Sequence, residues 1–330
     1  MRAEKIAEIV GAKIPEEKMD VEIGGVTVDQ SETEAGELCF VEEREGCVEA
    51  LERDASMVVT CKDNAALFPE SDSLIAGVED VAAAALRFAG HIVDEQDVSI
   101  TCLDTKAVTF LDMILKHKKS VGFLSGAWQD AFDKVMASET PLLVTDNALF
   151  YEALRPGKKR FDQKAKGYVV SADSLFRTTF KIDRYIYQYK PLTHLHLPAL
   201  QRAIAFCEAY ELPYTLEQLR YTKHLMPIFL EGEPSVQEVM KSDKVVILSD
   251  NAEDIVSARA YAADIGSWMA KTVVMLPHKT KMEDVRYPTY YRSEEEILSA
   301  IESLNFHYLF IYMPDEKMQK RLKERLGQRG

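Results

Sequence analysis

Four polar residues lie close together between a predicted strand and a predicted helix: Thr101, Asp104, Lys106 and Thr109. The run from Asp97 to Cys102 is typical of a short strand, and residues 108–117 have the apolar spacing of a helix. Such a turn binds phosphate when backbone N–H groups at the helix N-terminus, a lysine and a hydroxyl converge on the anion. A lone lysine after a strand is also an ordinary solvated residue, so both interpretations of Lys106 stay open.

The elements before this turn alternate between strand and helix patterns, which predicts an α/β fold. We expect helices at residues 3–10, 48–53 and 78–89, and strands at 21–28, 38–41 and 56–60. A further strand is expected at residues 121–124, after the helix that follows the turn. This strand–helix–strand unit should have parallel strands.

The elements after the turn form two groups. The first comprises a strand at 141–145, a helix at 146–154, an antiparallel hairpin or meander within 167–190, and helices at 197–210 and 215–223. In the second, strands at 244–248, 272–276 and 307–312 alternate with helices at 252–269, 293–303 and 316–326. This alternation predicts a doubly wound, Rossmann-like unit. Its boundary is expected near Glu231–Pro234, where Gly and Pro cluster.

The overall charge limits the classes of partner. The 330 residues carry a net charge of −14, and 47% of them are hydrophobic. An acidic surface repels nucleic acid and anionic lipid, so we expect neither partner. No run of apolar residues is long enough to predict a membrane span.

The five cysteines are widely spaced and odd in number: Cys39, Cys47, Cys61, Cys102 and Cys207. This pattern is typical of thiols in a reducing compartment and indicates neither a disulfide framework nor a metal site. The first residues mix charged and apolar types, unlike a signal peptide. We therefore expect a cytoplasmic protein.

The stretch Ile23-Gly-Gly-Val-Thr-Val-Asp-Gln-Ser resembles a segment of the Mur ligases, the ATP-dependent amino-acid-adding enzymes of peptidoglycan synthesis, and within them the tripeptide-adding type. The family's Asp-Ser-Arg corresponds here to Asp29, Gln30 and Ser31, and Gly36 also keeps its place. In the family this segment binds the uridine of a UDP-sugar. The resemblance therefore implies a UDP-sugar-type site at these three residues.

The turn described first falls where the family has its phosphate loop, Ile-Thr-Gly-Thr-Asn-Gly-Lys-Thr-Thr. Only the lysine survives in register, as Lys106, while Cys102 and Thr105 replace the glycines. Ala107 and Val108 replace the hydroxyls that hold Mg²⁺. A loop without glycine cannot easily wrap a triphosphate, and loss of the hydroxyl removes a contact to the metal ion. The resemblance implies ATP and Mg²⁺ as cofactors, whereas these substitutions predict a degenerate phosphate loop.

Other features of the family are shortened or altered in this sequence. The stretch that carries the family's acidic and histidine metal ligands is missing between residues 128 and 140. His196 and Ala199 replace two asparagines of a later helix start, and the Asp250 region resembles the opening of the third domain. An acyl-phosphate mechanism needs such metal ligands, because the bound metal ions neutralise the charge that develops in the transition state.

Three polar clusters have both a functional and a structural interpretation. His194 and His196 would share a face on a strand and hold a metal ion, although a local hydrogen-bonding role is the commoner use. The run Arg184–Lys190 has the aromatic residues to stack a base, or to form cross-strand pairs. The basic loop Arg155–Arg160 is an anion-site candidate or a solvated loop.

The sequence thus predicts an α/β protein of three segments. They are a UDP-sugar-binding-like domain (1–80), a shortened, P-loop-type central domain (81–232) and a Rossmann-like domain (233–330). The expected function is that of a catalytically impaired Mur-ligase-like protein that binds a nucleotide, a cell-wall precursor or a protein partner. The alternative is an active, divergent ATP-dependent amino-acid ligase. No metal site and no catalytic residue is predicted.

Overall fold

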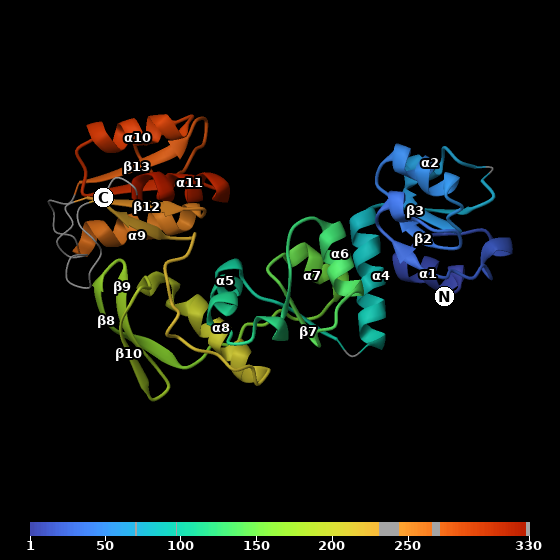
Figure 1. Cartoon of the computed structure of the whole chain (residues 1–330), viewed down its shortest axis with the longest axis horizontal. Helices are drawn as coiled ribbons and strands as arrows, with labels where there is room; N and C mark the ends of the chain where they lie inside the picture. Colours follow the sequence, from blue (N-terminus) through green and yellow to red (C-terminus); the bar gives the residue numbers. More distant parts are fainter. Residues whose placement is uncertain (70, 97, 231–243, 266–270, 328–330) are drawn as a thin grey trace. The chain divides into compact units, whose positions relative to one another are not determined.

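The structure is a computed structural model that describes the chain except for residues 70, 97, 231–243, 266–270 and 328–330. It contains two compact units (Figure 1). Unit 1 comprises Met1–Val108 and His117–Asp162, and unit 2 comprises Thr109–Lys116 and Gln163–Gly330. Among the described residues, no helix has the length and apolar character needed to cross a membrane.

Unit 1 begins with a four-stranded parallel sheet in the order β1-β2-β3-β4. Its strands are β1 (Val26–Thr27), β2 (Leu38–Phe40), β3 (Met57–Cys61) and β4 (Leu74–Val78). The accompanying helices are α1 (Ala3–Val10), α2 (Arg44–Glu52) and α3 (Lys62–Ala65). The predicted N-terminal α/β arrangement is confirmed. The predicted strand 21–28 is largely wrong, because only its last part pairs with β2.

The second sheet of unit 1 has three parallel strands in the order β5-β7-β6. They are β5 (Ser99–Cys102), β6 (Gly122–Leu124) and β7 (Leu142–Thr145). The helices are α4 (Val81–Glu95), α5 (Thr105–Ile114), which continues into unit 2, α6 (Trp128–Met136) and α7 (Ala148–Leu154). The expected parallel arrangement around the turn is confirmed, with β7 inserted between its two strands.

Helix α4 holds unit 1 together. It contacts α1, α6 and α7, and one hydrophobic core runs from Leu38 and Phe40 of the first sheet to Ile100 and Leu143 of the second. The alanines of α4 permit this close packing because they add little volume on either side. The predicted division between a domain that ends at residue 80 and one that begins at residue 81 stays a prediction.

Unit 2 contains a three-stranded antiparallel sheet in the order β10-β9-β8, followed by a long helix. The strands are β8 (Gly167–Ser174), β9 (Arg177–Ile182) and β10 (Tyr185–Lys190), and the helix is α8 (Leu197–Ala209). This confirms the predicted meander, whose alternating residues place Phe180 and Ile182 in the interior.

The remaining sheet of unit 2 has five strands in the order β11-β12-β15-β13-β14, and only β11 runs antiparallel to its neighbour. The strands are β11 (Met226–Phe229), β12 (Val245–Ser249), β13 (Thr272–Pro277), β14 (Thr289–Tyr291) and β15 (Tyr308–Tyr312). The helices are α9 (Ala252–Ile265), α10 (Glu294–Ser303) and α11 (Glu316–Gly327).

Helices cover both faces of this sheet (Figure 1). Val246 and Leu248 point into a core shared with α10 and α11, whereas Val245 and Ile247 point into a core shared with α9. Alternate side chains of β12 therefore enter two hydrophobic cores, one on each face of the sheet. This confirms the prediction of a doubly wound unit. The predicted boundary at Glu231–Pro234 and the end of the helix expected at 252–269 lie outside the described residues.

The helix predicted at residues 215–223 is wrong. Thr215 does accept a hydrogen bond from the Glu217 amide at 3.3 Å, as a cap would, but the chain then turns. Thr222 and Leu225 form an isolated bridge, and the Thr215 amide donates to the Ile114 carbonyl oxygen at 2.9 Å. Contacts with α5 thus replace the helix that the local pattern favours.

Candidate functional site

The turn between β5 and α5 is only two residues long, Leu103 and Asp104. The Leu103 amide donates to the Thr145 carbonyl oxygen at 3.0 Å, which continues the β5–β7 pairing past the strand end. A turn this short cannot enclose a chain of phosphates, which in phosphate loops is surrounded by several consecutive backbone amides.

Asp104 occupies the start of α5. Its Oδ1 accepts a hydrogen bond from the Ala107 amide at 3.0 Å, and its carbonyl oxygen accepts one from the Val108 amide at 2.9 Å. The amide groups of a first helical turn are the donors that would bind a phosphate. One of these donors is therefore already satisfied by a carboxylate of the chain itself.

The turn is buried on one side only, since Asp104 and Thr105 are exposed. Cys102, Leu103 and Ala107 are buried, whereas Lys106 is half-buried. The Phe161 amide donates to the Cys102 carbonyl oxygen at 3.2 Å, so the segment after α7 covers the end of β5. Burial raises the pKa of the Cys102 thiol, and Arg160 of the same segment lowers it in part.

The four residues of the predicted phosphate turn take different positions. Thr101 is buried within β5, Asp104 precedes α5, and Lys106 lies in its first turn. These three belong to unit 1, while Thr109 belongs to unit 2. Thr109 bonds to His224, so its hydroxyl is engaged away from the turn.

Asp29, Gln30 and Ser31, the residues of the predicted UDP-sugar-type site, form one tight turn. The Asp29 carboxylate accepts hydrogen bonds from the Ser31 amide at 2.9 Å and from the Ser31 hydroxyl at 2.6 Å. These two bonds lower the pKa of Asp29. Gln30 lines a hollow of about 250 Å³ that Trp128 and Gln129 of α6 border on the other side.

Carboxylates surround this second location. Glu42 and Glu43 line the same hollow. Partial burial raises the pKa of Asp133, and the charges of Asp130, Glu32 and Asp29 raise it further. A diphosphate would meet repulsion from several of these groups, because opposite charges are needed to offset its own.

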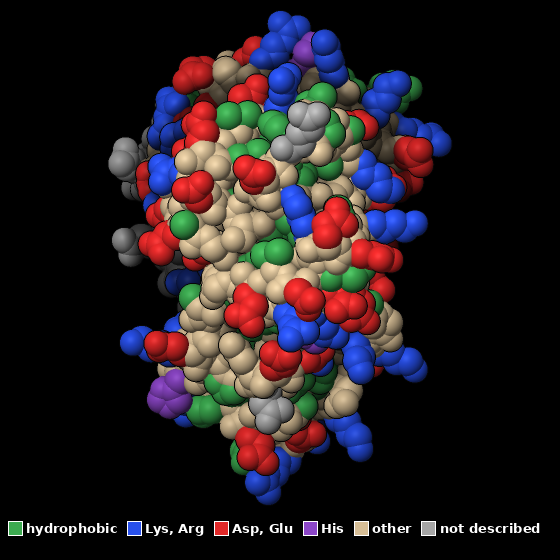
Figure 2. Space-filling model, turned by 90° about the vertical axis from the view of Figure 1, so that its right-hand side faces the viewer, with side chains coloured by type: hydrophobic (Ala, Val, Ile, Leu, Met, Phe, Trp, Pro, Cys, Tyr) green, Lys and Arg blue, Asp and Glu red, His purple; other side chains and the backbone are tan. Residues whose placement is uncertain are grey.

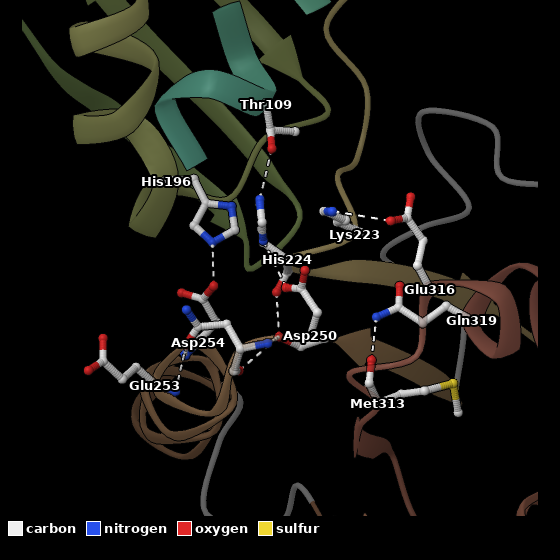
Figure 3. A network of polar contacts seen from close by, with 12 residues as sticks. Thr109, His196, Lys223, His224, Asp250, Glu253, Asp254, Met313, Glu316 and Gln319 are labelled. Carbon is white, nitrogen blue, oxygen red and sulfur yellow. Dashed lines mark hydrogen bonds and ion pairs between the residues drawn. The ribbon is translucent and has the colours of Figure 1, made fainter. Parts of the chain in front are cut away.

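The densest polar network lies in unit 2 and joins α5, the segment before β11, the end of β12 and α9 (Figure 3). His224 is the centre. Its Nε2 lies 3.0 Å from the Thr109 hydroxyl oxygen and its Nδ1 lies 2.8 Å from Asp250 Oδ1. Since the carboxylate can only accept, Nδ1 carries the proton and the Thr109 hydroxyl donates to Nε2.

A second histidine–aspartate pair lies beside the first. His196 Nε2 is 3.3 Å from Asp254 Oδ2, and both side chains are buried. The His196 ring is edge-on to those of His224 and Phe110, at centroid distances of 6.4 and 6.3 Å. In Figure 3 the His196 ring points toward Asp254, and the His224 ring lies between Thr109 and Asp250.

The metal-binding alternative, which required His194 and His196 to share a face on a strand, does not agree with the structure. The two residues form a 3-10 turn (η4, His194–His196), in which residues two apart diverge. His194 packs against Tyr261 at 4.2 Å between ring centroids, away from Asp254. Within the described part of the chain, no group of three metal-binding side chains is close enough to hold an ion.

The hydroxyl–imidazole–carboxylate order at Thr109, His224 and Asp250 is that of a hydrolase triad. Such a triad also needs space for a substrate. The hollow beside His196 measures about 10 Å³, roughly the space that one water molecule requires, and Thr109, His224 and Asp250 do not line it. The network connects α5, the segment before β11 and the end of β12 within unit 2.

Sequence reasoning missed His224 and Asp254. His224 precedes an apolar strand and gives no local pattern, since its partners come from positions 109 and 250. Asp250 and Asn251 follow the buried strand β12, at the edge where polar side chains of parallel sheets gather. This position after a buried strand was the signal that could have indicated Asp250 as a site residue from the sequence.

The chain was compared with known proteins. No protein-family model matches the sequence, and no curated protein matches it. The structure matches that of the MurF ligase from Thermotoga maritima in complex with ADP, with a TM-score of 0.58 and 10% identity over 94% of this chain and 100% of that one. Two crystal structures of MurF from Acinetobacter baumannii match with TM-scores of 0.55 and 0.52 at 11% and 10% identity, each over 98% of both chains.

The structural matches extend over nearly the whole chain. At sequence identities of 10–11% they show similarity of fold alone. All three structures are MurF ligases, so the tripeptide-adding type stays a prediction. The parallel sheets of unit 1, the doubly wound sheet of unit 2 and the structural matches agree with one another. The chain has a divergent Mur ligase-like fold.

Proposed function

We propose that this chain is a Mur-ligase-like protein that does not catalyse ligation and acts by binding. The observation that carries the proposal is the two-residue turn between β5 and α5, whose Asp104 carboxylate accepts from the Ala107 amide. At the position of a phosphate loop, the chain thus places its own anion. A phosphate there would have to displace that carboxylate and overcome its charge.

The loss of metal-binding groups supports the same proposal. Ala107 and Val108 carry no oxygen in their side chains, and Ala107 is fully buried. Acyl-phosphate formation relies on Mg²⁺ to neutralise the charge that develops on the phosphates. We infer that ATP turnover is lost, and with it the need for ATP and Mg²⁺ as cofactors.

The ligand classes proposed are a nucleotide, a cell-wall precursor or a protein partner. The hollow beside Gln30 is the candidate for a small molecule, with about 250 Å³. The carboxylates around it disfavour a UDP-linked precursor. We therefore favour a protein partner.

One observation favours the alternative, an active and divergent ATP-dependent ligase. Lys106 lies in the first turn of α5, where a lysine would reach phosphates bound at the helix start. In that case Lys106 would be essential for turnover, whereas the binding protein needs no phosphate ligand at this position.

Phosphate release separates the two. The purified protein is incubated with Mg-ATP and UDP-N-acetylmuramyl peptides, in parallel with Lys106→Ala. We expect no release above that of Lys106→Ala, and no rise in melting temperature with Mg-ATP. Release that disappears in Lys106→Ala would overturn the proposal, because a contaminating enzyme would be unaffected by that substitution.

The cytoplasmic location also remains a proposal. All five cysteines are free thiols, and Cys39, Cys47, Cys102 and Cys207 are buried. Burial raises the pKa of Cys39 to about 11 and that of Cys207 to about 12, which keeps both thiols protonated and unreactive. Free, inert thiols suit a reducing compartment.

A further inference from the structure

The outer face of the β8–β10 sheet exposes large apolar side chains. The strand register places Tyr168, Lys181 and Ile186 in one row across the three strands. Tyr168 and Ile186 are 57% and 56% exposed, and Tyr189 near the end of β10 is 54% exposed. We name these four residues, Tyr168, Lys181, Ile186 and Tyr189, the tyrosine–lysine face.

The opposite face of the sheet is buried along β9, although Val169 and Tyr185, which the register pairs with Phe180 and Ile182, are exposed. Phe180 and Ile182, which alternate with Lys181 along β9, are almost fully covered. The α8 helix contacts β8, and Gln201 of α8 donates hydrogen bonds to the Ala165 and Gly167 carbonyl oxygens at 3.1 and 3.0 Å. The sheet is thus anchored on one side only.

The exposure of this sheet is unusual for the molecule. Six of the thirteen large hydrophobic side chains that are exposed in the described residues belong to its strands: Tyr168, Val169, Val170, Tyr185, Ile186 and Tyr189. On the side of the molecule shown in Figure 2, by contrast, charged side chains of both signs are interspersed and hydrophobic ones are scattered. Concentrated apolar exposure of this kind marks interaction sites.

The charge of this region is opposite to that of the chain. Residues 163–190 contain six Lys and Arg against two Asp, in a protein whose net charge is −14. Lys181 Nζ lies 6.0 Å from the centre of the Tyr168 ring, and the Arg184 guanidinium lies 5.3 Å from that of Tyr185. Lys181 therefore places a positive charge beside the exposed ring of Tyr168 on the outer face, whereas Arg184 lies against Tyr185, which the register pairs with Ile182 of the other face.

The edges of the sheet are poorly suited to binding an added strand. The pairing of β8 with β9 shifts register twice, between Val169 and Ser171 and between Ala172 and Ser174. The pairing of β10 with β9 shifts between Tyr187 and Lys190. Such irregular edges oppose backbone pairing with another chain, so contacts must come from the side chains of the face.

We propose that the tyrosine–lysine face binds an acidic segment of another protein that carries apolar side chains between its carboxylates. This inference rests on the proposed function, since it specifies the protein partner. A carboxylate would pair with Lys181, and apolar groups would cover Tyr168 and Ile186. A nucleic acid is disfavoured, because a long polyanion would extend over residues whose total charge is strongly negative.

The test uses fluorescence anisotropy with the full-length chain and three labelled probes. These are a short peptide of alternating Glu and Leu, the same peptide with Gln in place of Glu, and oligothymidylate. The variants are Lys181→Glu, the double variant Tyr168→Ser with Ile186→Ser, and Tyr287→Ser as a matched control, since Tyr287 is 97% exposed elsewhere in unit 2. Circular dichroism melts confirm that each variant is folded.

We expect the Glu–Leu peptide to bind best and to lose affinity as salt is raised. Lys181→Glu and the double variant should weaken binding roughly tenfold or more, while Tyr287→Ser leaves it unchanged. Failure of the Glu–Leu peptide to bind would overturn the inference. It would also be overturned if oligothymidylate bound better and depended on the same residues, or if the wild type formed a dimer that the double variant abolishes.

The failure of this inference can be told apart from the failure of the proposed function. Phosphate release that depends on Lys106 overturns the non-catalytic proposal whatever the peptide does. A protein that releases no phosphate and ignores the acidic peptide retains the non-catalytic proposal and loses only the assigned surface.

Discussion

At the scale of single residues, a few side chains decide what the phosphate-loop position can do. Asp104 is one of them, because its carboxylate caps the helix that would otherwise offer free amides to an anion. Thr109 is another, since its hydroxyl bonds to His224 of unit 2. The sequence predicted that the glycines and metal hydroxyls were lost. It could not predict that the polar residues left over would be engaged by the chain itself.

His224 should be the most sensitive residue of the unit 2 network. Replacing it by Ala removes a buried ring and leaves Thr109 and Asp250 without their shared partner. We expect a loss of about 3 kcal/mol in the free energy of unfolding, measured by urea denaturation. Thr109→Val removes one contact only and should cost about 1 kcal/mol. Equal stability of His224→Ala and the wild type would contradict the assigned role.

His194 should make stability depend on pH. Burial lowers its pKa below 6.5, and the neighbouring His196 lowers it further. Between the folded and the unfolded pKa, only the unfolded chain binds the proton, so this residue costs stability as pH falls below 6.5. The replacement His194→Phe, which keeps a ring against Tyr261, should lose less stability than the wild type between pH 7.5 and pH 5.5. Parallel pH profiles from chemical denaturation would exclude this contribution.

At the scale of elements, the sequence predicts best where one face of a strand or helix meets a hydrophobic core. The meander of β8–β10 and the doubly wound end follow this rule, and α10 begins where predicted, with the Ser293 hydroxyl accepting from the Glu296 amide. The helix expected at residues 215–223 fails because contacts with α5 stabilise another path. Helix α6 and strand β4 were not predicted, since α6 packs against α4, more than 30 residues earlier, and β4 pairs with β3.

The contact between α4 and α7 depends on the absence of a side chain at Gly90. A Cβ atom built there would lie 2.2 Å from the Leu154 carbonyl oxygen, a distance that real atoms do not adopt. The backbone of one helix must therefore move in Gly90→Ala, although alanine is the better helix former. We expect a loss of about 2 kcal/mol in the unfolding of unit 1, measured by urea denaturation. A gain in stability would mean that the two helices are packed less closely than the structure has them.

At the scale of the whole molecule, the fold and the chemistry have separate origins. The fold rests on apolar periodicity, which persists at 10% identity to MurF ligases over nearly the whole chain. A binding site rests on a few polar residues, whose replacement leaves that periodicity unchanged. This is why the resemblance predicted the architecture and the degenerate turn, whereas the exposed face of β8–β10 could be recognised only once the register was known.

The two compact units should unfold in separate steps. Unit 1 has one core that includes both of its sheets, and unit 2 has cores on both faces of its five-stranded sheet. Each unit buries enough apolar surface for a cooperative transition of its own. Scanning calorimetry should therefore give two transitions. Gly90→Ala should lower only the one that belongs to unit 1, and His224→Ala only the other.

Gly90→Ala and His224→Ala can assign each calorimetric transition to one unit, because each variant perturbs the interior of one unit. The chain passes from one unit to the other within α5, between residues 108 and 109, so some coupling is expected when α5 frays. Coupling of that kind would broaden a transition without moving its midpoint. A single transition that both variants shift by the same amount would instead mean that the two units fold as one cooperative body.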